Sequence, residues 1–147
     1  MLGMSERRSL FMSHVPREPE RAFGFARSGS GDDDRRAELR RLRLCRVARG
    51  IASAAFGVPE AEIQKPNRSV AASCEARHIA MYLARVIFEV PYAVIGQEFG
   101  RDRTSVSHAI RRIEDRRDDR SFEEKLSGLE RLAENCLSLT AGEEDET

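Results

Sequence analysis

The sequence predicts an all-α fold, a small helical bundle built around a helix-turn-helix. Apolar residues recur at the i, i+3, i+4, i+7 spacing of amphipathic helices in several separate stretches. Gly and Pro stand between these stretches, at places where helices end or begin. The chain has 147 residues, which is enough for one independently folding domain with flanking segments.

Residues 91–113 predict two short helices joined by a tight turn. Pro91 suits the start of a helix, where its missing N–H is not needed. Val94, Ile95 and Phe99 give this first helix an apolar stripe. Gly100 ends it, because glycine accepts the left-handed conformation that a helix C-cap requires.

The second helix of the pair has one apolar and one polar face, and Asp102 or Thr104 is placed to cap it. Its apolar face holds Val106, Ala109, Ile110 and Ile113. The opposite side collects hydrogen-bond donors, namely Thr104, His108 and Arg111, with Ser107 and Arg112 beside them. Such a face suits the major groove of DNA, although an ordinary solvated helix has the same pattern.

The stretch IGQEFGRDRTSVSHAIRRI, residues 95–113, resembles the signature of the C-terminal, origin-binding domain of the bacterial replication initiator family DnaA. That signature reads IG, two residues, an apolar residue and then roughly GGRDHTTVLHAVRKI. The upstream ARHIAMYLAR resembles the helix that precedes it in the family, and the similarity runs from about Leu39 to Leu137. The resemblance implies a Trp-repressor-like helix-turn-helix fold that binds double-stranded DNA.

The resemblance and the residue chemistry together predict a set of DNA-contacting residues. Arg103 and Thr104 are expected at base edges, and Asp102 is expected to orient arginines or to accept from a cytosine. Phosphate contacts are expected from Arg77, Ser105 and Arg112. The full predicted set is Lys65, Arg68, Arg77, His78, Arg101, Asp102, Arg103, Thr104, Ser105, His108, Arg111 and Arg112.

The sequence departs from the family signature at the turn. One glycine of GGRDH is missing, and Arg103 stands where the family has a base-reading histidine. Arginine binds guanine through O6 and N7, so the preferred DNA sequence is expected to differ from the initiator's own site. The second threonine of the signature is Ser105, which keeps a hydroxyl for a phosphate but has no methyl group for a thymine.

The charge distribution divides the chain, although the net charge is zero. Residues 35–117 hold 17 basic and 9 acidic residues, a net charge of +8, and residues 118–147 hold 3 and 10, a net charge of −7. A basic body suits a nucleic-acid partner. We predict a disordered extension over residues 1–31, the helix-turn-helix domain over 32–138 and an acidic, disordered tail over 139–147.

Three further helices are predicted around the motif. Asp32 to Asp34 begin the first, whose Arg40, Arg43, Arg46 and Arg49 are expected on the surface. A second is expected over residues 76–89, with Arg77 and His78 in its first turn. A closing helix follows residue 117, with Ser121 and Glu124 as its capping box and an apolar stripe of Phe122, Leu126, Leu129, Ala133 and Leu137.

Several classes of function are not favoured. The three cysteines form no CxxC pair and the three histidines are scattered, so we expect no disulfide framework, metal or cofactor. There is no GxxxxGK[ST] loop, nucleophile elbow or pair of carboxylates, so we expect no ATPase and no enzyme. No apolar run approaches membrane-spanning length, and a cytoplasmic, nucleoid-associated protein is expected.

Two hypotheses of function follow. The first is a sequence-specific DNA-binding regulator of replication initiation, or of transcription from related sites, without ATPase activity. The alternative is an adaptor that binds DnaA or the clamp-associated AAA+ factor that inactivates it. In the N-terminal segment, Ser9, Leu10 and Phe11 resemble the end of peptides that dock on the sliding clamp, although the usual first residues of such peptides are replaced by Arg7 and Arg8.

Overall fold

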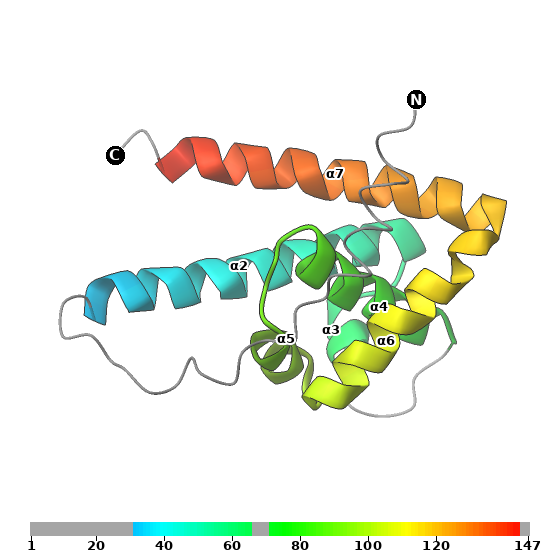
Figure 1. Ribbon diagram of the computed structural model, residues 1–147, viewed down its shortest axis with the longest axis horizontal. Helices are drawn as coiled ribbons and strands as arrows, with labels where there is room; N and C mark the ends of the chain where they lie inside the picture. Colours follow the sequence, from blue (N-terminus) through cyan, green and yellow to red (C-terminus); the bar gives the residue numbers. More distant parts are fainter. Residues whose placement is uncertain (1–30, 66–70, 145–147) are drawn as a thin grey trace. The chain divides into compact units, whose positions relative to one another are not determined.

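The computed structural model describes residues 31–65 and 71–144, and every regular element in these ranges is a helix. The predicted all-α fold with a helix-turn-helix is therefore confirmed (Figure 1). Residues from Asp34 onward form one compact unit. The predicted N-terminal extension, the sliding-clamp motif at Ser9, Leu10 and Phe11, and Arg68 of the basic loop lie outside the described residues.

Helix α2 (Gly31–Phe56) begins with the acidic run that the sequence analysis placed at its positive end. It ends where Gly57 takes a left-handed φ of 62°. Its buried face consists of Leu44, Cys45, Ala48, Arg49, Ile51 and Ala52. Burial raises the pKa of the Cys45 thiol to about 12.

The expected surface position of Arg49 is wrong. Its side chain is buried, 3.5 Å from Glu98 of the helix that precedes the turn, and its guanidinium lies 6.0 Å from the centre of the Phe99 ring. The sequence pattern placed it with the exposed arginines because a buried arginine is uncommon unless it is paired. The carboxylate that pairs with it comes from a distant part of the chain.

Helix α3 (Glu60–Gln64) and helix α4 (Ala71–Val86) follow. Helix α4 is the centre of the core, and its buried apolar residues include Ile79, Ala80 and Leu83. It contacts α3, α5 and α6. Helix α4 also begins earlier than the expected start at residue 76, so Arg77 lies in its second turn and His78 at the start of its third, and neither lies in its first.

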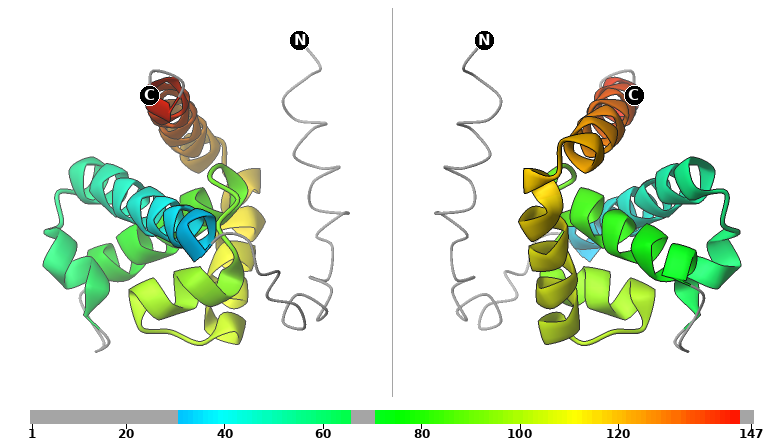
Figure 2. Two further views of the ribbon diagram at one scale, coloured as in Figure 1. Left: turned by 90° about the vertical axis from the view of Figure 1, so that its left-hand side faces the viewer. Right: turned by 90° about the vertical axis from the view of Figure 1, so that its right-hand side faces the viewer.

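The motif itself consists of helix α5 (Tyr92–Phe99) and helix α6 (Arg103–Asp115), followed by the short 3-10 helix η1 (Arg116–Asp118). Both views in Figure 2 place the turn between α5 and α6 on the side of the bundle opposite helix α7 (Arg120–Glu144). The DNA-contacting face expected on α6 is therefore remote from the closing helix.

Helix α7 packs as its apolar stripe predicts, because Phe122, Leu126 and Ala133 are buried and Leu129 and Leu137 pack against the core. The predicted capping box of Ser121 and Glu124 is wrong. The cap is Asp119, whose Oδ1 accepts from the N–H groups of Ser121 at 2.9 Å and Phe122 at 3.2 Å. The helix continues to Glu144, beyond the residue 138 at which the domain was expected to end.

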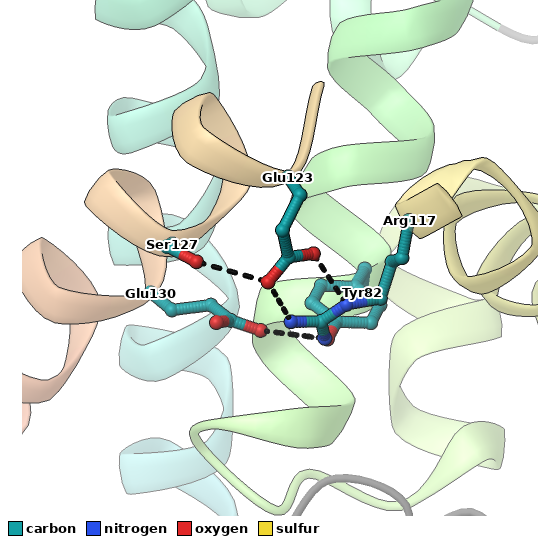
Figure 3. Close-up of polar contacts among 5 residues, drawn as sticks. All are labelled: Tyr82, Arg117, Glu123, Ser127 and Glu130. Atoms are coloured by element: carbon teal, nitrogen blue, oxygen red, sulfur yellow. Dashed lines mark hydrogen bonds and ion pairs between the residues drawn. The ribbon is translucent and has the colours of Figure 1, made fainter. Parts of the chain in front are cut away.

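A cluster of polar side chains ties α7 to α4 and η1 (Figure 3). The Tyr82 hydroxyl donates to Oε1 of the buried Glu130 at 2.7 Å and accepts from Arg117 at 2.7 Å. Arg117 also donates through two nitrogens to the Glu123 carboxylate, at 2.7 Å each. Burial and the neighbouring Glu130 carboxylate raise the pKa of Tyr82, so its hydroxyl stays protonated. This cluster holds the start of α7 against α4, at the point where the chain passes from α6 through η1 into α7.

Candidate nucleic-acid interface

The turn between α5 and α6 is closed by two backbone hydrogen bonds around Gly100. Gly100 has a left-handed φ of 62°, and its N–H donates to the Gln97 carbonyl at 3.4 Å. The Arg101 N–H donates to the Gly96 carbonyl at 2.8 Å. This pair of bonds ends the helix as the sequence predicts for a glycine C-cap.

Gly96 has a second role in this turn. A Cβ at this position would lie 2.5 Å from the carbonyl oxygen of Arg101, closer than real Cβ contacts allow. The backbone of the turn therefore passes against the bare Cα of Gly96. The glycine in the IG pair of the motif is required by this close approach, a role that the sequence alone did not reveal.

Asp102 starts α6 as its N-cap. Its Oδ1 accepts from the Ser105 N–H at 2.7 Å, which confirms one of the two predicted caps. This hydrogen bond lowers the pKa of Asp102. One carboxylate oxygen of Asp102 thus serves the helix end, and its expected contact with arginines or a cytosine stays a prediction.

The two faces of α6 separate as predicted. Val106, Ala109, Ile110 and Ile113 are buried in the core. The opposite face and its flanks carry eight exposed polar side chains, those of Arg103, Thr104, Ser105, Ser107, His108, Arg111, Arg112 and Asp115. Ser107 was absent from the predicted contact set, although its flanking position on the helical wheel was a signal for it.

A shallow depression lies beside the exposed face of α6, lined by residues of α6 and by His78 of α4. The α6 residues at its edge include Ser105, His108, Arg111 and Arg112. Partial burial lowers the pKa of His78, and the guanidinium groups of Arg112, Arg77 and Arg101 lower it further. His78 is therefore neutral near pH 7. The depression holds the cations Arg111 and Arg112 and one carboxylate, that of Asp115, so its lining is net positive and suits an anion such as a phosphate.

The phosphate contact expected of Arg77 is not compatible with its position. Its side chain is only 3% exposed, and its Nε donates to the Ile63 carbonyl at 2.7 Å. One terminal nitrogen donates to the carbonyls of Lys65 at 2.8 Å and Glu62 at 3.3 Å. Arg77 therefore holds the C-terminal end of α3 against α4, where a cation suits the carbonyl end of a helix.

Lys65 lies at that same end of α3, and its exposed ammonium pairs with Glu62. It stands at the edge of the undescribed segment 66–70, so the expected contact with the minor groove stays a prediction. Among the described residues, no cluster of His, Cys, Asp and Glu has the arrangement of a metal site. No helix in the described ranges is long and apolar enough to span a membrane.

Residues 49–113 match a family model, the bacterial dnaA protein helix-turn-helix. The match contains the last third of α2 and all of α3 to α5, and it ends within α6 at Ile113. The last buried residue of the α6 apolar face is thus also the last residue of the matched segment.

Chromosomal replication initiator proteins are among the relatives that this chain resembles. The chromosomal replication initiator protein DnaA of Bartonella quintana is 35% identical over 100 residues, which cover 67% of this chain and 20% of that protein. The DnaA of Agrobacterium fabrum is 38% identical over 79 residues, covering 53% and 16%. The chain thus spans about a fifth or less of the length of these relatives.

The fold is also similar to a solved structure. The crystal structure of a DNA replication initiation factor matches with a TM-score of 0.63 and 28% sequence identity, over 69% of this chain and 31% of that one. Residues 49–113 of this chain are therefore similar to the helix-turn-helix of the bacterial dnaA protein.

Proposed function

We propose that this domain binds double-stranded DNA sequence-specifically, with α6 in the major groove, and that it regulates replication initiation or transcription from related sites. One observation carries the proposal. Seven of the eight exposed polar side chains of α6, those from Arg103 to Arg112, lie within a segment that matches the DnaA helix-turn-helix. A recognition helix needs such a face, rich in donors and free of the core.

The position of each side chain along α6 suggests its role. Arg103 and Thr104 stand in the first turn, from which a recognition helix contacts base edges. His108 and Arg111 continue the same face toward the C-terminal end. Ser105 and Arg112 border the depression beside His78, and with Arg101 they are assigned to phosphates.

The name of the relatives, chromosomal replication initiator protein, supports the link to initiation. The 147 residues contain no P-loop motif, so we propose that this chain acts without hydrolysing ATP. The adaptor hypothesis gains no support from the comparisons, which match replication initiator proteins. Of the features behind it, the N-terminal segment with Ser9, Leu10 and Phe11 lies outside the described residues.

The proposal is tested with the full chain and a duplex selected from a random library. Affinity is measured by fluorescence anisotropy at about 0.05 M and 0.2 M salt, against the selected and a scrambled duplex. Thr104→Ala is expected to lower the preference for the selected duplex by about tenfold, since a good base contact contributes about 1 to 3 kcal/mol. Arg112→Ala is expected to lower the affinity for both duplexes alike. It should also reduce the salt slope, the slope of log affinity against log salt concentration, by about 1 in magnitude.

Two outcomes would count against the proposal. If the selection enriches no sequence and the wild-type chain binds all duplexes equally, the domain does not read DNA sequence. If Thr104→Ala and Arg112→Ala have the same effect on both duplexes, the division into base and phosphate contacts is wrong.

A further inference from the structure

Helix α2 carries a group of exposed arginines that neither the core nor the motif uses. Arg35, Arg36, Arg43 and Arg46 are all exposed, and we call them the arginine stripe. At about 100° per residue, they fall within roughly 100° of one another on the side of α2 that faces away from its buried residues. In the part of the chain that the structure describes, these four guanidinium groups take part in no ion pair.

Acidic residues are sparse within the stripe, and Asp32, one turn before Arg36, is the acidic residue on the same side of α2. Between Arg35 and Arg46 the only acidic residue is Glu38, and it lies roughly 110° from the centre of the stripe. The stripe extends about 16 Å along the helix, at a rise of about 1.5 Å per residue. One strand of DNA carries a phosphate about every 3.4 Å of axis, so several phosphates fall within this length.

One end of the arginine stripe lies near the helix-turn-helix. Arg49, one turn after Arg46, contacts Glu98 and Phe99 at the end of α5, directly before the turn. The stripe therefore begins beside the motif and continues toward the start of α2. Figure 1 shows this part of α2 running past α5.

We propose that the arginine stripe contacts the phosphates of DNA that flanks the site read by α6. The inference rests on the proposed DNA-binding function and extends it with a second, sequence-independent surface. A lipid surface is less suitable as the partner, because a membrane-binding helix needs a broad apolar face. The outward side of α2 offers a single large exposed apolar residue, Leu39 at 46% exposure.

The test compares two variants of the full chain with equal changes in charge. Arg36→Gln/Arg43→Gln removes two charges from the stripe, and Arg120→Gln/Arg131→Gln removes two exposed charges from α7. Gln and Arg have similar helix propensities, so both helices are retained, and thermal unfolding checks this. Each variant is titrated with a duplex of about 12 base pairs, which holds only the selected site, and with one of about 30 base pairs.

On the long duplex, the stripe variant is expected to lose about 2 from the salt slope and at least about tenfold in affinity at 0.1 M salt. The α7 variant is expected to bind both duplexes like the wild type. On the short duplex, all three proteins are expected to bind alike. Arg36→Lys/Arg43→Lys, which keeps the charges, is expected to restore the slope.

Several results would overturn the inference. One is an unchanged slope for the stripe variant on the long duplex, and another is an equal loss from the α7 variant. A third is loss of binding to vesicles of anionic phospholipid while the DNA slope is intact, which would assign the stripe to lipid. If the wild type binds neither duplex, the proposed function itself fails. If it binds both without using the stripe, only this inference fails.

Discussion

A methyl group on Gly96 would lie 2.5 Å from the carbonyl oxygen of Arg101, so the turn of the motif is packed against a position that only glycine can occupy. The same two residues are joined by the hydrogen bond from the Arg101 N–H to the Gly96 carbonyl, at 2.8 Å. Gly96 therefore sets the path by which the chain leaves α5. That path in turn sets the angle at which α6 meets DNA.

Gly96→Ala is expected to destabilise the protein by about 1 to 3 kcal/mol, because backbone atoms must move to admit the methyl group. DNA affinity should fall as well, since the turn that orients α6 is displaced. Urea unfolding and anisotropy measure the two effects. Gly128→Ala is the matched control, because it lies in α7 with open space around it and should stabilise the protein by about 1 kcal/mol. Equal stability of the two variants would contradict the close approach.

Arg77→Gln separates a structural from a DNA-binding role for Arg77, because it removes the charge together with the guanidinium. Glutamine cannot reproduce the several directed donors of a guanidinium, so the carbonyls of Ile63 and Lys65 lose partners and stability should fall by about 2 kcal/mol. The salt slope of DNA binding should not change, because the side chain is buried. A reduced slope with unchanged stability would instead restore the phosphate contact predicted from the sequence.

Tyr82→Phe tests the polar cluster that holds α7. Loss of the hydroxyl removes the hydrogen bond to Glu130 and the one received from Arg117, both at 2.7 Å. The free energy of unfolding should fall by about 1 to 3 kcal/mol, since Glu130 is buried. Tyr92→Phe, on α5, is the control substitution. If both variants unfold at the same urea concentration as the wild type, this cluster does not stabilise the attachment of α7.

His78 makes stability depend on pH in a defined direction. Its folded pKa lies below its ordinary value of 6.5, so between these two values the unfolded chain binds more protons. The stability contributed by neutral His78 is therefore present above about pH 6.5 and is lost as the pH falls. Urea unfolding at about pH 7.5 and 5.5 should show a smaller loss for His78→Gln than for the wild type. A pKa above 6.5 for His78 in an NMR titration of the free protein would contradict the predicted direction of this pH dependence.

The local features of the motif could be predicted from the sequence, because they depend on neighbouring residues. Gly100 as the end of α5, Asp102 as a cap of α6 and the buried face through Val106 all follow from spacing of a few residues. The same holds for the apolar stripe of α7, where only the capping residue was misplaced by two positions.

The buried polar residues could not be predicted in this way. Arg77 binds carbonyls more than ten residues earlier, Arg49 pairs with Glu98 of another helix, and Glu130 is buried against Tyr82. An arginine on a helical wheel is usually exposed, and only a distant partner overrides that expectation. The early start of α4 also contributed to the wrong prediction for Arg77, because it places this residue in the second turn of the helix and not in an exposed first turn.

The central claim is that the exposed face of α6 touches DNA, and an NMR titration tests it most directly. The ¹⁵N-labelled full chain is titrated with the selected duplex. We expect the largest amide shifts from Arg101 to Arg112, together with intermolecular contacts between the Thr104 methyl group and base protons. Shifts confined to α7, with the signals of Thr104, His108 and Arg111 unchanged, would contradict the account.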